Sequence, residues 1–141
     1  RDYPGFSFEV ADVRELPFAD ASLAGVVCWY SLIYLAPADR PAAYAQLARV
    51  VKPGGHLAIA YKAGDGRLRR GGRAANLGVG FDVYWERPEE RARLAADAGF
   101  EPVFQSRTFA EGPDGAVQGY LLARRTAGEE AAGRPQEGQN L

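Results

Sequence analysis

Residues 37–61 read PADRPAAYAQLARVVKPGGHLAIAY, and this stretch predicts a helix, a tight turn and a strand. The apolar side chains of its first half recur at the spacing of one helix face, namely Tyr44, Leu47, Ala48 and Val51. We therefore expect a helix over residues 37–51. The sequence Lys52-Pro53-Gly54-Gly55 suits a type II turn. Residues 56–61 are mostly apolar and predict a buried strand, so the stretch is typical of an α/β sheet.

Two further strands are predicted before this helix. Residues 6–11 alternate apolar and polar side chains and stop at Asp12, which predicts a strand that ends there. Residues 23–29 are uncharged and rich in β-branched and aromatic side chains, which favours a strand buried on both faces. The uncharged segment 21–38 is interrupted by glycine, serine and proline, so a strand and a turn explain it better than a membrane span.

A loop, a helix and a hairpin are predicted after the central strand. Residues 62–86 are rich in glycine and predict a long loop that is either functional or disordered. Residues 88–98 begin with proline and two acids and are followed by glycine, which is typical of a helix. Residues 103–109 and 116–124 predict two antiparallel strands joined by a turn at 112–115.

The order of these elements predicts an α/β fold, a Rossmann-like, doubly wound and mostly parallel sheet with a C-terminal antiparallel hairpin at its edge. No G-x-G-x-x-G turn follows a first strand, so we expect the N-terminal strands of such a sheet to be missing. Residues 1–125 are expected to form the C-terminal part of a domain. Residues 126–141 have almost no apolar anchor and predict a disordered tail.

The composition excludes several classes of protein. The 141 residues are 47% hydrophobic and 25% charged, with a net charge of −1, which argues against a nucleic-acid binder held by bulk charge. Cys28 and His56 are the sole cysteine and histidine, so we expect neither a disulfide framework nor a metal site. No signal peptide is visible. We therefore expect a cytoplasmic protein with no membrane contact and no obligate protein partner.

Ligands of open α/β sheets gather outside the carboxyl ends of the strands. Three predicted strands end in groups that suit a flat heterocycle, at Asp12, at Trp29-Tyr30-Ser31 and at Tyr61-Lys62-Ala63. Other interpretations stay open, because Asp12 is equally suited to cap the next turn and the aromatic residues to fill a core.

Two segments carry a more specific pattern. Residues 12–27 read DVRELPFADASLAGVV, and residues 47–60 read LARVVKPGGHLAIA. In this order and spacing they resemble the C-terminal portion of class I S-adenosylmethionine (SAM)-dependent methyltransferases, in particular the type 11-like enzymes that act on small molecules. The family patterns are D-x-x-x-L-P-F-x-D-x-S-F-D-x-V and R-V-L-K-P-G-G-x-L. The resemblance covers about residues 3–125.

The resemblance implies candidate site residues. In the family, the position of Asp12 meets the adenine amino group and the backbone at Val13 meets the ring. The implied cofactor-binding residues are Asp12, Val13, Arg14, Trp29, Tyr30 and Ser31. The implied substrate-binding residues, in and near the loops after the family's fourth and fifth strands, are Tyr34, Tyr61, Asp82 and Tyr84. No catalytic residue is assigned, because the cofactor supplies the reactivity.

The implied function is SAM-dependent methyl transfer to a small molecule. The family's glycine-rich turn and its ribose-binding acidic residue have no counterpart in the sequence, so we expect the isolated chain to be inactive and to bind SAM weakly or not at all. Two alternatives stay open. One is a non-catalytic Rossmann-like binding module, and the other is a nicotinamide-dependent oxidoreductase.

Overall fold

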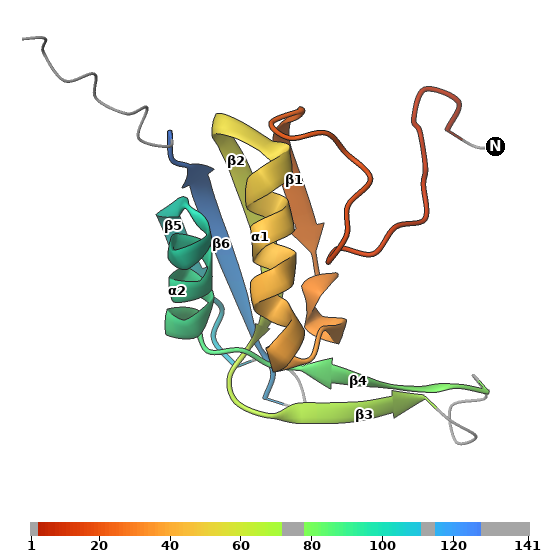
Figure 1. The fold of residues 1–141 in the computed structure, drawn as a ribbon. Coiled ribbons are helices and arrows are strands. Elements are labelled where there is room, and N and C mark those ends of the chain that lie inside the picture. The colour runs from red at the N-terminus through yellow and green to blue at the C-terminus, as the bar shows by residue number, and fades with distance from the viewer. Residues whose placement is uncertain (1–2, 72–77, 111–114, 128–141) are drawn as a thin grey trace, which may run out of the picture.

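The structure, a computed structural model, describes residues 3–71, 78–110 and 115–127 (Figure 1). In this part of the chain, a four-stranded sheet carries two helices, and a two-stranded hairpin lies beyond the end of the sheet. The elements are, in chain order, β1 (Leu23–Trp29), the 3₁₀ helices η1 (Leu32–Tyr34) and η2 (Pro37–Asp39), α1 (Arg40–Val50), β2 (Val51–Ala63), β3 (Arg67–Gly71), β4 (Gly80–Tyr84), α2 (Pro88–Ala98), β5 (Phe100–Arg107) and β6 (Val117–Arg125).

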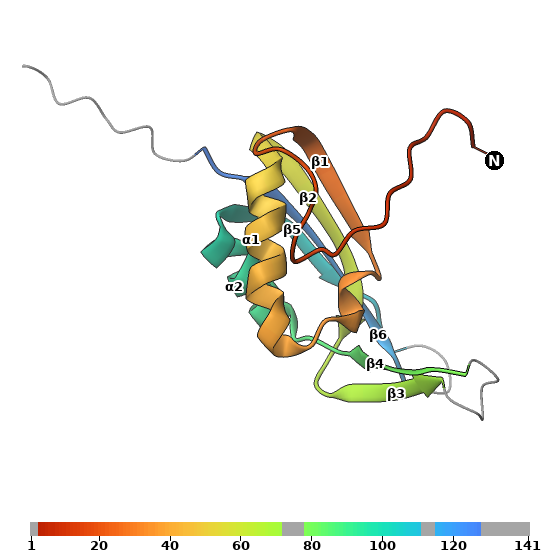
Figure 2. The same ribbon diagram turned by 45° about the vertical axis from the view of Figure 1, so that its right-hand side comes forward.

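Both predicted helices are confirmed, and both lie on the same face of the sheet (Figures 1 and 2). The first begins as the 3₁₀ turn η2 and continues as α1, with Pro41 in its first turn, where proline costs no hydrogen bond. The second ends at Gly99, whose φ of +103° is the left-handed conformation that glycine adopts easily. Local signals decide both helices, which is why the sequence predicts them well.

The sheet has the order β1-β2-β6-β5, so the predicted C-terminal hairpin of β5 and β6 is confirmed at one edge. β1 pairs with β2 in parallel, whereas β6 pairs antiparallel with both β2 and β5. Within the hairpin, β5 is the edge strand and β6 lies inside the sheet. After β2, the chain passes through α2 and places β5 two positions away from β2 in the sheet. β6 then returns to fill the position between them. There both edges of β6 have a hydrogen-bonding neighbour.

The predicted turn at residues 52–55 is confirmed as an irregularity within β2. Gly54 has a φ of +79°, as the third position of a type II turn requires. A side chain at Gly55 would place its Cβ atom 2.6 Å from the Ala24 carbonyl oxygen, so that position also needs glycine. The pairing of β1 with β2 jumps across this turn, from Val51 to His56.

The two faces of the sheet differ, which corrects the prediction that residues 23–29 are buried on both faces. The helix-covered face packs Leu57, Ile59 and Leu121 into the core. On the opposite face, Val27 is 70% exposed and Trp29 is 60% exposed. No helix in the described part of the chain covers that face (Figure 2).

The predicted strand at residues 6–11 is wrong. The segment alternates apolar and polar side chains, but it forms no strand, and Phe6, Phe8 and Val10 are exposed. A strand needs a neighbouring strand to accept its backbone hydrogen bonds, and no strand of the described residues pairs with residues 6–11. Alternation alone therefore gives the wrong assignment here.

Within residues 62–86, where a long loop was predicted, the strands β3 and β4 form a hairpin. β3 and β4 pair antiparallel, with Leu68 opposite Val83 and Arg70 opposite Phe81. Residues 72–77 lie outside the described part of the chain. The same holds for most of the predicted turn at 112–115 and of the predicted tail at 126–141.

A buried cluster of charges fastens the base of this hairpin to both helices. The Glu86 side chain is 1% exposed, contacts the Arg91 guanidinium and lies 3.7 Å from Nε of Arg40. Arg91 also donates to the Tyr44 hydroxyl at 2.7 Å. The Glu86 backbone N–H donates to the Lys62 carbonyl oxygen, so the residues just before and just after the hairpin are bonded to each other at its base. Burial raises the pKa of Glu86, while Arg91 and Arg40 oppose that rise.

We expect Glu86→Gln to lower the free energy of unfolding by about 3–5 kcal/mol, because it leaves the buried Arg91 guanidinium without a counter-charge and leaves Arg40 paired with Glu90 alone. Urea unfolding measures the loss. Arg93→Ala is the control, since its ion pair with Asp97 is exposed and should contribute less than about 1 kcal/mol. An equal loss in the two variants would show that the cluster does not anchor the hairpin.

Candidate cofactor and acceptor site

Aromatic side chains gather where β1 and β2 end. The ring centroids of Trp29 and Tyr120 are 5.6 Å apart, and those of Trp29 and Tyr30 are 5.9 Å apart. The hydroxyl oxygens of Tyr30 and Tyr120 are separated by 3.3 Å, and Nζ of Lys62 lies 5.8 Å from the centre of the Tyr30 ring. We call Trp29, Tyr30 and Tyr120 the aromatic cluster. Sequence reasoning missed Tyr120, because only the pairing of β6 with β2 brings it here.

Tyr30 adopts an unusual backbone conformation within this cluster. Its φ is +51°, in the left-handed region that bulky residues avoid, and its N–H donates to the Ala60 carbonyl oxygen at 2.9 Å. Such strain concentrates at functional sites. Burial, followed by the neighbouring Tyr120 hydroxyl, raises the pKa of Tyr30 to about 12. Tyr30 therefore keeps its proton near neutral pH. The exposure of Trp29 excludes the alternative that it is an ordinary core residue.

Asp12 forms a local ion pair in the loop before β1. Oδ1 of Asp12 accepts from the Arg14 backbone N–H at 2.8 Å, and Oδ2 accepts from Nη2 of Arg14 at 2.7 Å. Arg14 also lies 3.3 Å from Oδ1 of Asp39, which ties this loop to the start of α1. The hydrogen bonds to Arg14 lower the pKa of Asp12 to about 2. Asp12 therefore caps its own turn, and its carboxylate stays exposed to solvent.

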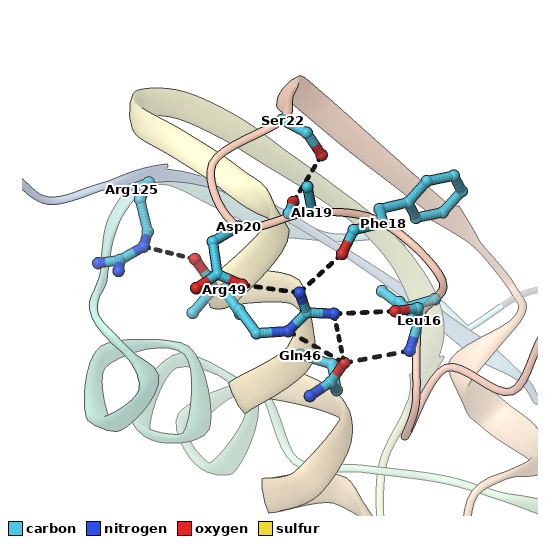
Figure 3. Close-up of polar contacts among 9 residues, drawn as sticks. Leu16, Phe18, Ala19, Asp20, Ser22, Gln46, Arg49 and Arg125 are labelled. Carbon is cyan, nitrogen blue, oxygen red and sulfur yellow. Dashed lines mark hydrogen bonds and ion pairs between the residues drawn. The ribbon is translucent and has the colours of Figure 1, made fainter.

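Arg49 holds the rest of this loop in place (Figure 3). Its guanidinium donates to the carbonyl oxygens of Leu16 at 2.8 Å and Phe18 at 2.7 Å, and to the Asp20 carboxylate at 2.8 Å. Its remaining bonds go to Oε1 of Gln46, which also accepts from the Leu16 N–H. All five N–H donors of the guanidinium are thus used. Sequence reasoning assigned Arg49 no role, although Asp20 and Arg49 each lie in one of the two quoted segments.

A cavity of about 530 Å³ lies between the end of β2, η1 and the β3–β4 hairpin. We call it the hairpin cleft. Its lining residues are Ile33, Lys62, Leu68, Arg70, Val83, Trp85 and Ala116. Lys62 lines the cleft and also approaches the Tyr30 ring, so the cleft adjoins the aromatic cluster.

None of the four expected substrate-binding residues lines the hairpin cleft. Tyr61 is fully buried, and the centre of its ring lies 4.6 Å from the Arg91 guanidinium carbon. It is therefore a core residue. Asp82 and Tyr84 lie on the opposite face of the hairpin from Val83, because side chains alternate along a strand. Tyr34 is exposed and packs edge-on against Phe81.

The expected cofactor-binding residues come from two segments. Asp12, Val13 and Arg14 form the turn before β1, whereas Trp29, Tyr30 and Ser31 follow its carboxyl end. Val13 is partly buried against the core, and Ser31 is exposed at the start of η1.

Comparisons with known proteins point to one family. A family model described as a methyltransferase domain matches residues 1–55. The O-methyltransferase resE of Aspergillus sclerotiorum is 44% identical over 54 residues, which are 38% of this chain and 20% of that protein. Methyltransferase GfsG of Streptomyces halstedii is 43% identical over 54 residues, 38% of this chain and 19% of that protein. The chain spans about a fifth of the length of the curated relatives it matches.

Solved structures extend the similarity to most of the chain. A SAM-dependent methyltransferase from Methanosarcina mazei has a TM-score of 0.73 at 19% identity, covering 86% of this chain and 68% of that one. A Burkholderia thailandensis N1-methyltransferase, solved with S-adenosylhomocysteine, has a TM-score of 0.60 at 24% identity, covering 83% and 49%. The [4+2]-cyclase SpnF has a TM-score of 0.65 at 18% identity, covering 86% and 56%.

These comparisons confirm the resemblance that the two sequence segments indicated. The chain shares the fold of solved SAM-dependent methyltransferases, and its first 55 residues match a model described as a methyltransferase domain. The cyclase shows that this fold also supports other chemistry, so function has to be argued from the site. Among the described residues, none of the helices has both the length and the apolar character that a membrane crossing requires.

We expect Arg49→Ala to lower the free energy of unfolding by about 2–3 kcal/mol, because it removes charged hydrogen bonds to two backbone carbonyls and a glutamine. Asp20→Ala should cost less than about 1 kcal/mol, since that carboxylate is exposed. Equal losses in urea unfolding would mean that the ion pair, and not the carbonyl contacts, holds the loop.

Removing Arg14 should raise the pKa of Asp12 from about 2 toward its ordinary value near 3.8. Carbon-detected NMR titration of the Asp12 carboxyl measures this in Arg14→Ala, with Arg93→Ala as the control. Because the folded-state pKa is lowered, the stability from this pair is complete above pH ~4 and is lost as the pH falls toward 2. An unchanged Asp12 pKa in Arg14→Ala would contradict the assigned cause.

Proposed function

We propose that this chain functions in SAM-dependent methyl transfer to a small molecule. The single observation that carries the proposal is the match of residues 1–55 to a methyltransferase domain, since these residues include the Asp12 turn, β1 and the aromatic residues at its end. The relatives and structures named above are methyltransferases and a cyclase, and none of them is named as a nicotinamide-dependent oxidoreductase.

The described residues fit SAM in part. The exposed Asp12 carboxylate suits the adenine amino group, and the backbone at Val13 suits the ring edge. Arg14 orients Asp12 through their paired hydrogen bonds. SAM supplies an electrophilic methyl group on a sulfonium cation, and cations are attracted to aromatic faces such as those of Trp29 and Tyr30. Ser31 follows directly as a polar neighbour.

The chain's own residues would then contribute positioning more than acid–base chemistry. Tyr30, with a pKa of about 12, is a poor general base near neutral pH. Positioning alone accelerates a displacement reaction when the reacting groups are held in line. We place the methyl acceptor in the hairpin cleft, with Tyr34 at the exposed surface beside it, because the cleft adjoins the aromatic cluster through Lys62.

Several expectations from the sequence remain proposals. These are a cytoplasmic location, a domain over residues 1–125, the absence of nucleic-acid and obligate protein partners, and the need for groups beyond this chain to bind SAM tightly. The non-catalytic alternative is a module that keeps the sheet but has lost the cofactor half, and it predicts neither S-adenosylhomocysteine binding nor methyl transfer.

The full-length gene product that contains these residues should bind S-adenosylhomocysteine, and Asp12→Ala should weaken that binding about ten- to hundredfold, the effect of losing a charged hydrogen bond. Calorimetry measures the affinity, and thermal unfolding measures the stability of the same samples. The 141-residue chain, which lacks a G-x-G-x-x-G turn, should bind more weakly.

The two measurements separate the two roles of Asp12. A variant that melts normally and binds weakly supports direct contact with the cofactor. A variant that melts early and binds normally assigns Asp12 to capping its turn alone. If the full-length protein does not bind S-adenosylhomocysteine at all, the proposed function is wrong.

A further inference from the structure

We propose that the hairpin cleft binds an acceptor with an apolar body and one anionic oxygen group, a carboxylate or a phosphate. Calling the ligand a methyl acceptor rests on the proposed function. The ligand's chemistry rests on the cleft alone, because it follows from which side chains line the cleft and which of them are already neutralised.

The apolar part of the cleft comes from three elements. Ile33 of η1 and Val83 of β4 are buried at its base, and Leu68 of β3 lies opposite Val83 in the hairpin. Trp85, which directly follows β4, adds an aromatic surface. The volume of about 530 Å³ is within the range of small-molecule sites. A ligand body of one or two rings therefore fits the cleft by size and polarity.

Among the described residues that line the cleft, two are cations and none is an acid. Lys62 comes from the end of β2 and Arg70 from β3. Neither forms an ion pair with any residue in the described part of the chain. Within that part of the chain, the positive charge of the cleft therefore has no counter-charge.

The hairpin's register separates these cations from the other arginines of β3. Arg67 and Arg69 lie opposite Tyr84 and Asp82, on the face turned away from Leu68 and Val83. Asp82 lies 3.7 Å from the Arg67 guanidinium and 3.3 Å from that of Arg69. Asp82, the one acid of the hairpin strands, thus pairs with the arginines on the face turned away from the cleft, which we call the outer face. Arg70 lines the cleft.

An anionic group is the ligand chemistry that this arrangement favours. The planar guanidinium of Arg70 matches the paired oxygens of a carboxylate or a phosphate. The Lys62 ammonium adds a second positive charge. Lys62 is half-buried and Arg70 is exposed, so the apolar lining strengthens the interaction at Lys62 more than that at Arg70. A neutral ligand of the same shape would gain only the apolar contacts.

Three probes of matched shape test this in the 141-residue chain by calorimetry without SAM: naphthalene-2-carboxylate, 2-naphthyl phosphate and the neutral 2-naphthamide. The two anions should bind at least about tenfold more tightly than the amide, as expected for hydrogen bonds to charged groups. Arg70→Gln and Lys62→Gln should each remove most of that preference while leaving the amide's affinity unchanged. Arg69→Gln, on the outer face of the same strand, is the matched control and should keep the preference.

Each outcome decides the proposal. Equal affinity for the three probes overturns it, and so does a loss of preference in Arg69→Gln equal to that in Arg70→Gln, because the arginines would then act only as a diffuse charged surface. Preference for one anion over the other assigns the group as carboxylate or phosphate. If the anions bind as expected but the full-length protein does not bind S-adenosylhomocysteine, the cleft assignment stands and the methyl-transfer proposal fails.

Discussion

The five hydrogen bonds of the Arg49 guanidinium are the constraint on which the site depends. Three of them join the last turn of α1 to the carbonyl groups of residues 16 and 18 and to Asp20, over about thirty positions of sequence. The loop they hold carries Asp12 at one end and enters β1 at the other. Because a carbonyl facing Arg49 would otherwise need water, this one side chain replaces solvent at two backbone carbonyl groups of the loop. The contact directly joins the two motif segments.

A second arginine-based network positions the other half of the site. Glu86, held between Arg40 and Arg91, closes the base of the β3–β4 hairpin against both helices. The hairpin then forms one wall of the hairpin cleft, next to the aromatic cluster. Loops with few apolar anchors are free to move unless polar contacts fix them. In this molecule the Asp12 loop and the hairpin are both fixed by charged contacts to α1, which makes that helix the common support of the proposed cofactor and acceptor regions.

The fold by itself does not decide the chemistry, since a [4+2]-cyclase shares it with methyltransferases. The chemistry has to be argued from the groups at the carboxyl ends of β1 and β2. These are a strained Tyr30, an exposed Trp29 and a Lys62 that lies between the aromatic cluster and the hairpin cleft. They suit the binding and orientation of two ligands better than proton transfer, and this matches a displacement reaction in which the bound cofactor supplies the reactive group.

Residue patterns in the sequence determined β1, α1, the glycine turn and α2, because periodicity, capping residues and turn chemistry act within a few positions. They also placed Trp29 at the end of a strand, where ligands gather, whereas Asp12 follows no strand. The tertiary structure alone decided that residues 6–11 form no strand, that β6 lies inside the sheet and that Tyr61 is buried. It also decided that Arg70, and not Asp82, lines the cleft. These outcomes depend on which distant segment supplies the hydrogen bonds of a strand and covers a face of the sheet. The residues next to that strand in the sequence do not determine this.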